Sequence, residues 1–160
     1  MRYYSLNGQS PAVSFKEAVV LGQAPDKGLY FPEQVPLLPA SFWESIRETG
    51  DEEIAWRILS PYVGGDLTEA ALRKVIAETL NFPLPVRQVS EHISVLELFH
   101  GPTLAFKDIG ARFMSRCLAH FAEGLQRRVV VLVATSGDTG GAVANSFFGV
   151  PLTDVVVLYP

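Results

Sequence analysis

The feature that most constrains the fold of this sequence is a nearly unbroken apolar run, "RRVVVLVAT", at residues 127–135. Successive apolar residues in a strand are typical of a parallel sheet with both faces buried. A second such run, "DVVVLYP", follows at 154–160, and "TGGAVANSFFG" between them predicts a helix that ends at Gly149. Strand, helix and strand over 129–159 fill the roughly 30 residues of a βαβ unit, whose crossover we expect to be right-handed. The sequence therefore predicts an α/β protein containing the start of a parallel, helix-flanked sheet.

That sheet is expected to be incomplete. Two or three parallel strands leave apolar faces uncovered, because such sheets usually have about five or six strands. The sequence ends at Pro160, directly after a strand of the core type. We therefore expect either a truncated part of a longer protein or a chain that takes further strands from a partner.

The N-terminal part has a different pattern, in which short helices alternate with strand-like segments. Ser14 and Glu17 form a capping-box pattern that predicts a helix start, and Gly22 predicts the end of that helix. The segment "RYYSLN", at residues 2–7, predicts a short strand. Further helices are expected at residues 40–49, 51–61 and 67–80.

A change of pattern suggests a domain boundary. The segment "NFPLPV" breaks regular structure, and "ISVLELF" at residues 93–99 then predicts a strand. Residues 103–123 follow with the apolar spacing of a helix. We place a mixed α+β N-terminal domain at residues 1–92 and the incomplete α/β domain at residues 93–160.

Composition excludes several classes of function. The 160 residues are 48% hydrophobic and 19% charged, as in a globular protein that can bury a core. The net charge of −4 argues against a nucleic-acid partner, which normally requires a basic surface. No run approaches the roughly 18 apolar residues of a membrane helix, and the N-terminus lacks a cleavage signature. We expect a cytoplasmic protein without nucleic-acid or membrane partners.

The cysteine and the histidines indicate little chemistry. The single cysteine, Cys117, lies on an apolar helical face, so we interpret it as buried filler. His92 and His120 have no second ligand at metal spacing, so no metal site is predicted. His100, in "FHGPT", follows a strand end, where α/β folds bind ligands; it either lines a site or has only a loop role.

One lysine, Lys107 in "LAFKDIGARFM", stands near the start of an otherwise apolar helix. Helical side chains lean toward the N-terminus, so the small residues Gly110 and Ala111 leave a hollow over this lysine. An amine that loses hydration in such a hollow becomes a nucleophile toward carbonyl groups. Lysines of this kind form Schiff bases with substrates or with pyridoxal phosphate. The alternative interpretation is an ordinary solvated lysine.

The segment "ATSGDTGGAVA", at residues 134–144, joins a strand end to a helix start. Backbone N–H groups at such a helix N-terminus attract anions. The segment has neither the P-loop pattern nor G-x-G-x-x-G, and the carboxylate of Asp138 would repel a phosphate. The hydroxyls of Thr135, Ser136 and Thr139 suit a carboxylate or a polar ring substituent. Alternatively, Ser136 or Asp138 only caps the helix.

Two long motifs, "LELFHGPTLAFKDIGARFM" and "LVATSGDTGGAVA", together resemble the threonine synthase family. These are pyridoxal-phosphate enzymes of the tryptophan-synthase-β type of fold. The segment from Tyr4 to Pro36 is similar to the N-terminal domain of that family, so the resemblance covers essentially the whole chain. It implies a lyase that converts O-phospho-L-homoserine and water to L-threonine and phosphate, the last step of threonine biosynthesis.

The resemblance also implies roles for individual residues. Lys107 would bind pyridoxal 5'-phosphate as a Schiff base and, once released, shuttle protons. Asp138 is the best candidate for approaching the hydroxyl of the cofactor ring. The loop that would grip the α-carboxylate of the substrate comprises Thr135, Ser136, Gly137, Asp138 and Thr139.

In the family, the glycine-rich loop for the cofactor phosphate and the residue that contacts the pyridine nitrogen come from later sequence. The resemblance therefore implies that a missing C-terminal half is needed to complete the site, and that these 160 residues alone have little or no turnover. The alternatives are a related phospholyase or dehydratase, a fragment or interaction module that binds no cofactor, and an N-terminal module that only docks on the rest.

Overall fold

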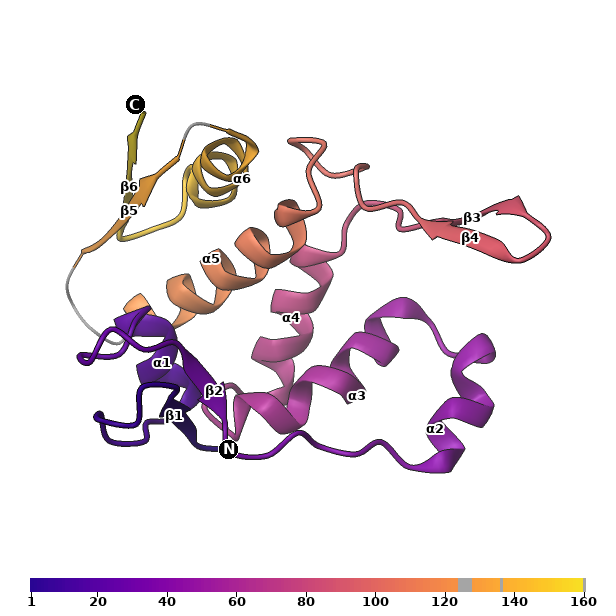
Figure 1. Ribbon diagram of the computed structural model, residues 1–160, viewed down its shortest axis with the longest axis horizontal. Coiled ribbons are helices and arrows are strands. Elements are labelled where there is room, and N and C mark those ends of the chain that lie inside the picture. Colours follow the sequence, from indigo (N-terminus) through magenta and orange to yellow (C-terminus); the bar gives the residue numbers. More distant parts are fainter. Residues whose placement is uncertain (124–127, 136, 160) are drawn as a thin grey trace. The chain divides into compact units, whose positions relative to one another are not determined.

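The computed structural model describes residues 1–123, 128–135 and 137–159, and the chain divides into two compact units, Met1–Ala77 and Glu78–Pro160. The first unit contains an antiparallel strand pair, β1 and β2, followed along the chain by helices (Figure 1). Its elements are β1 (Tyr3–Ser5), α1 (Phe15–Leu21), β2 (Tyr30–Pro32), α2 (Ala40–Ser45), a 3-10 turn (Ile46–Glu48), α3 (Asp51–Val63) and α4 (Glu69–Thr79) up to Ala77; the last two residues of α4 belong to the second unit.

Local sequence signals set these elements. The Ser14 hydroxyl accepts a hydrogen bond from the Glu17 N–H (3.2 Å), and the Glu17 carboxylate accepts one from the Ser14 N–H (2.8 Å). This capping box confirms the predicted start of α1. Gly22, with φ 70°, ends the helix as predicted, because glycine adopts positive φ without a steric penalty. The strand predicted within residues 2–7 is confirmed as β1.

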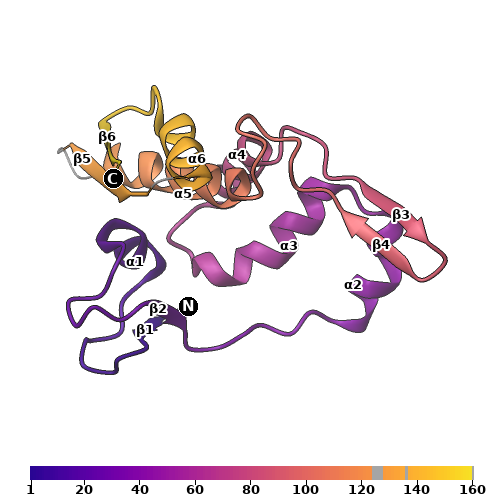
Figure 2. The ribbon, with the colours of Figure 1, turned by 45° about the horizontal axis from the view of Figure 1, so that its top comes forward.

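Tyr3 ties β1 to the helices of its unit. Its ring lies 6.0 Å from that of Phe15 on α1, which lies beside the strand pair (Figure 2). Its hydroxyl donates a 2.9 Å hydrogen bond to the carbonyl of Tyr62 on α3. Burial, the largest cause, raises the pKa of Tyr3 to about 12, so the phenol stays a hydrogen-bond donor at neutral pH.

The second unit carries the predicted βαβ segment. Strands β5 (Val129–Ala134) and β6 (Thr153–Leu158) pair in parallel, and α6 (Asp138–Phe147) connects them. α5 (Lys107–Glu123) precedes them and packs against α6 (Figure 1). This arrangement confirms the α/β fold class.

Helix α6 covers one face of the β5–β6 pair. Gly140 allows the close approach, because a Cβ there would lie 2.7 Å from Thr135 Cγ2 and 3.3 Å from Val157 Cγ1. Within the described residues the other face is uncovered: Val130 and Leu132 on β5 are 62% and 65% exposed, and Val156 and Leu158 on β6 are also exposed. The expectation that two strands leave an apolar face uncovered is therefore confirmed for this chain.

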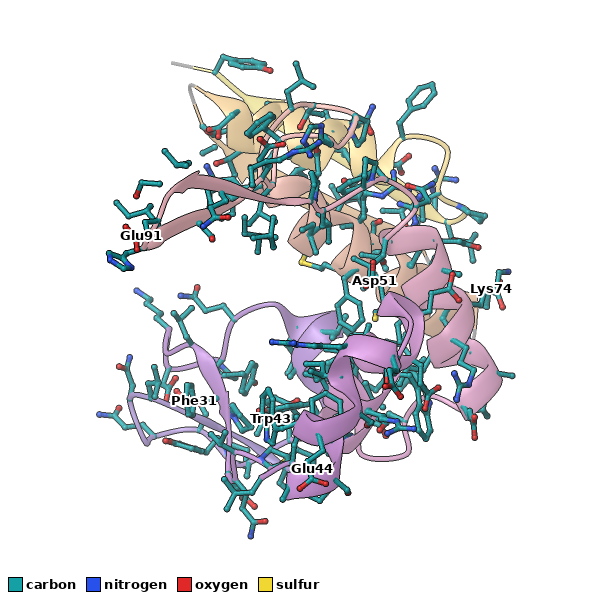
Figure 3. The ribbon with its side chains drawn as sticks, turned by 90° about the vertical axis from the view of Figure 1, so that its right-hand side faces the viewer. Phe31, Trp43, Glu44, Asp51, Lys74 and Glu91 are labelled. Atoms are coloured by element: carbon teal, nitrogen blue, oxygen red, sulfur yellow. The ribbon has the colours of Figure 1, made fainter. Side chains whose placement is uncertain are left out.

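The observed strand in the region of residues 93–99 differs from the predicted one. It is shorter, β4 (Ile93–Leu96), and it pairs antiparallel with β3 (Val86–Ser90), a strand that was not predicted and that begins at the last residue of the predicted break. The hairpin extends away from α5 and α6, with Glu91 in the turn at its tip (Figures 1 and 3). Every residue of both strands is exposed, so the hairpin is not part of the parallel sheet.

The two compact units divide at residues 77 and 78, and the domain boundary placed at residues 92 and 93 stays a prediction. Arg112 on α5 donates hydrogen bonds to the Glu78 carbonyl (2.5 Å) and the Asn81 side chain (2.9 Å). Its guanidinium also lies 5.8 Å from the Phe82 ring. These contacts hold the segment after residue 77 to the second unit.

Helix α5 has a buried side. Cys117 is 0% exposed, and burial raises its pKa to about 12. The thiol therefore stays protonated and fills space, which confirms its interpretation as buried filler. Neither α5 nor any other helix of the described ranges is long and apolar enough to cross a membrane.

Asp26 organises the loop between α1 and β2. Its carboxylate accepts hydrogen bonds from the Ser5 hydroxyl (2.6 Å) and from the N–H groups of Gly28 (2.9 Å) and Gln9 (2.9 Å). The Ser5 hydrogen bond is the largest cause that lowers the pKa of Asp26 from 3.8 to about 2. The ionised carboxylate thus connects β1 to this loop.

We expect Asp26→Asn to destabilise the chain near neutral pH. Because the folded-state pKa is lowered, the stabilisation from Asp26 is fully present above 3.8 and is lost as the pH falls toward about 2. The difference in urea midpoint between wild type and variant should therefore narrow over that range, as followed by circular dichroism. Glu44→Gln, which removes another exposed carboxylate of this unit (Figure 3), should not reproduce this narrowing. A constant difference for Asp26→Asn would contradict the prediction.

Candidate functional site

The candidate site lies where two helices of the second unit begin. Lys107 is the first residue of α5, and Asp138 is the first residue of α6. The Lys107 Nζ donates to both carboxylate oxygens of Asp138, at 3.1 Å and 3.0 Å. The Lys107 side chain is 34% exposed and that of Asp138 is 58% exposed, so the pair lies at the surface of the unit.

The electrostatics of the pair favour a carboxylate at Asp138. The hydrogen bond from Lys107 is the largest cause that lowers the pKa of Asp138, and the charge of Lys107 adds to it. The N–H groups of Thr139 and of Asp138 itself act in the same direction. The N-cap residue of α6 is Gly137, so Asp138 is the first helical residue, and its carboxylate faces Lys107 while it also interacts with first-turn N–H groups.

A pocket of about 350 Å³ adjoins Lys107. Small residues make the room: Gly110 and Ala111 line it from α5, which confirms the hollow predicted over the lysine. The other lining residues are Phe106, Lys107, Met114, Thr139, Ala142 and Val143. The walls are therefore mostly apolar, with one cationic side chain at the edge.

The amine of Lys107 is less dehydrated than predicted. Nζ faces the Asp138 carboxylate at 3.0 Å, and its side chain keeps a third of its exposure. On another side, Nζ lies 5.1 Å from the centre of the Phe106 ring, within the range of a cation–π interaction. The reason for the difference is Asp138, which lies 31 residues away in sequence.

Of the residues predicted at 135–139, Thr135 and Gly137 lie between β5 and α6, and Asp138 and Thr139 begin α6. The Thr135 N–H donates to the Leu158 carbonyl (3.1 Å), and its hydroxyl accepts from the Gly137 N–H (3.3 Å). Thr139 and Lys107 both line the pocket. Ser136 lies outside the described residues. The structure thus brings Lys107, Asp138 and Thr139 together, with Thr135 and Gly137 in the adjoining turn.

A buried carboxylate next to the lysine, that of Asp108, was not predicted. Asp108 is 0% exposed and accepts hydrogen bonds from the Thr103 N–H (2.9 Å) and hydroxyl (2.5 Å). A Cβ on Gly101 would lie 2.5 Å from the Asp108 Oδ2, so this turn requires glycine. Leu104, with φ 60°, completes a turn that delays the start of α5 from the predicted residue 103 to Lys107. An Asp in the first turn of a helix, shortly after "HGPT", was the available signal.

His100 has a loop contact. Its Nε2 lies 2.7 Å from the Glu97 carboxylate, and its ring packs on that of Phe99 with centroids 4.7 Å apart. His100 is absent from the described lining of the pocket at Lys107. Within residues 1–123, 128–135 and 137–159, no group of three or more His, Cys, Asp or Glu residues is arranged to hold a metal ion.

The sequence matches characterised proteins along its whole length. The family model described as threonine synthase N terminus matches residues 2–80. The chain is 42% identical to threonine synthase of Serratia marcescens and 40% identical to that of Escherichia coli, over 160 residues in each case. It spans 37% of the length of each of these two relatives.

Solved structures give the same result. A threonine synthase from Brucella melitensis, described as bound to PLP, superposes with a TM-score of 0.94 at 36% identity. It aligns with 100% of this chain, which covers 36% of that one. Threonine synthase from Escherichia coli superposes with a TM-score of 0.91 at 40% identity, and this chain covers 37% of it. These likenesses confirm the resemblance found in the two motifs.

Alanine substitutions at two glycines, one in the turn before α5 and one lining the pocket, should have different effects on stability. Gly101→Ala is expected to destabilise the chain by about 1–3 kcal/mol, because the added Cβ pushes against the buried Asp108 carboxylate. Gly110→Ala is the matched control, since a Cβ there has no neighbour within 4 Å. Alanine within a helix stabilises by up to about 1 kcal/mol over glycine. Urea unfolding measures both, and equal effects would contradict the proposed fit of the turn at Gly101.

Proposed function

We propose that this chain, which matches threonine synthases along its whole length, supplies the lysine-bearing part of a pyridoxal-phosphate site in a threonine-forming enzyme. The reaction proposed for the whole protein is the conversion of O-phospho-L-homoserine and water to L-threonine and phosphate, that of a carbon–oxygen lyase acting on phosphates. The observation that carries the proposal is the position of Lys107, at the edge of an apolar pocket and opposite the β5–α6 turn. A cytoplasmic location stays a prediction.

The residues present fit such a cofactor. A pocket of about 350 Å³ with apolar walls suits a flat aromatic ring, and Lys107 offers a primary amine at its edge. Asp138 and Thr139 provide polar groups beside it, for a ring hydroxyl or for the substrate. The carboxylate of Asp138 makes this side of the pocket unsuitable for a phosphate group. We therefore assign the phosphate of the cofactor to residues beyond this chain.

Each residue has a proposed role in the reaction. Lys107 holds the cofactor covalently and, when released, accepts and returns protons at Nζ. The turn at residues 135–139 orients the substrate by binding its carboxylate through N–H groups and hydroxyls at the start of α6. When bound, the cofactor stabilises negative charge on the substrate carbons. Asp108 acts indirectly, because it fixes the turn that leads into Lys107.

The partner proposed for this chain is the remaining part of the protein. The chain spans 37% of the length of its relatives, and the described part of the second unit leaves one face of β5 and β6 open. A cofactor that is held at one end only is poorly oriented, and catalysis depends on orientation. We therefore expect little or no turnover from the 160 residues alone.

A chimaera tests the proposal. Residues 1–160 replace the matching part of Escherichia coli threonine synthase, to which they are 40% identical. We expect the chimaera to form threonine from O-phosphohomoserine, and borohydride reduction with pyridoxal phosphate to label Lys107, as located by peptide mass spectrometry. Lys107→Ala should remove the label and lower the rate by about 10³-fold or more, because no other group replaces the amine.

Lys74→Ala, on α4, is the matched control and should keep both the label and the rate. A label on Lys16, Lys27 or Lys74 in place of Lys107 would contradict the proposed role. So would threonine formation by the Lys107→Ala chimaera at the unchanged rate.

A further inference from the structure

The ion pair at the start of α5 and α6 engages the nitrogen that the proposed function uses as its nucleophile. We propose that Asp138 is a positioning residue that holds Lys107 at the pocket as an ion-paired ammonium and shields Nζ from electrophiles. The pair must then open before Nζ forms a bond to carbon. This inference rests on the proposed function, because it concerns how the same amine is presented.

The geometry gives the lysine one defined position. Both Asp138 oxygens lie within 3.1 Å of Nζ, so two hydrogen bonds constrain the end of a flexible four-carbon side chain. Asp138 is itself fixed, because it begins α6, which packs closely on β5 and β6 at Gly140. The Phe106 ring lies 5.1 Å from Nζ and occupies a further side. The carboxylate and the ring thus each occupy one side of the nitrogen, whose side chain is otherwise 34% exposed.

The carboxylate is a counter-ion and a poor base. Lys107 lowers the pKa of Asp138, so this carboxylate binds protons weakly and stays negatively charged beside Nζ. An ammonium has no lone pair for attack, and its hydrogen bonds to Asp138 must break before it reacts. Asp138 therefore orients Lys107 and restrains its reactivity through the same two contacts.

Competitive acetylation of the native chain measures this restraint. The chain contains four lysines, Lys16, Lys27, Lys74 and Lys107. Trace acetic anhydride is applied with Nα-acetyl-lysine as an internal standard, and peptide mass spectrometry gives the relative rate at each residue. We expect Asp138→Asn to raise the rate at Lys107 by about two- to five-fold, the range that corresponds to the loss of an exposed ion pair. The rates at the other three lysines should not change.

Two variants control for charge and for folding. Asp138→Glu keeps the carboxylate and should return the rate at Lys107 to within about two-fold of wild type. Asp154→Asn removes an exposed carboxylate that pairs with Arg128, and it should leave Lys107 unchanged. An unchanged Lys107 rate in Asp138→Asn, or an equal rise at all four lysines, overturns the proposal.

A salt series tests the pair in the wild-type chain without any substitution. Raising sodium chloride from about 0.05 M to about 1 M shortens the screening length to about 3 Å, so the rate at Lys107 should rise relative to the standard. A flat salt response overturns the proposal even if the variants do not fold. Because acetylation needs no cofactor, a protected Lys107 together with a chimaera that takes no pyridoxyl label would overturn the proposed function and leave this inference intact.

Discussion

Parallel pairing of β5 and β6 determines where the groups of the candidate site lie. The two strands run in register from Val129 opposite Thr153 to Ala134 opposite Leu158, so their carboxyl ends meet at one edge. Thr135 then bonds to Leu158, and α6 begins three residues later. Ligands of α/β proteins bind at this edge of the sheet. That pairing therefore determines the position of the polar turn, of the start of α6 and of the Asp138 carboxylate.

Two carboxylates near Lys107 perform different tasks because their surroundings differ. Asp108 is fully buried and accepts hydrogen bonds from Thr103, so it holds the backbone in one path. Asp138 is more than half exposed and meets an ammonium, so it can exchange partners. The buried group sets where the lysine begins its helix, and the exposed group sets where the nitrogen points.

Much of this arrangement could be predicted from patterns within short stretches of sequence. The apolar runs predicted β5 and β6, the capping box predicted α1, and the small residues Gly110 and Ala111 predicted the hollow. Contacts between distant residues could not be read in this way. The pair of Lys107 with Asp138 joins residues 31 apart, and the degree of hydration of the amine depends on it.

The pairing within the β3–β4 hairpin could not be predicted, for a related reason. The prolines before β3 favour a structural break, and the polar residues of "VRQVS" weaken its strand pattern, so its pairing with β4 was not evident. The side-chain contacts of Arg112 draw residues 78–82 into the second unit, which no local pattern shows. The roles of the turn at residues 135–139 stay predictions.

The open face of β5 and β6 has a consequence for the life of this polypeptide in a cell. The exposed valine and leucine side chains of this face can bind other apolar surfaces and unpaired strands. Chaperones and proteases recognise such surfaces. The abundance of the chain should therefore depend on how quickly the exposed face of β5 and β6 is covered after synthesis. The residues that build the sheet thereby also set its susceptibility to aggregation and degradation.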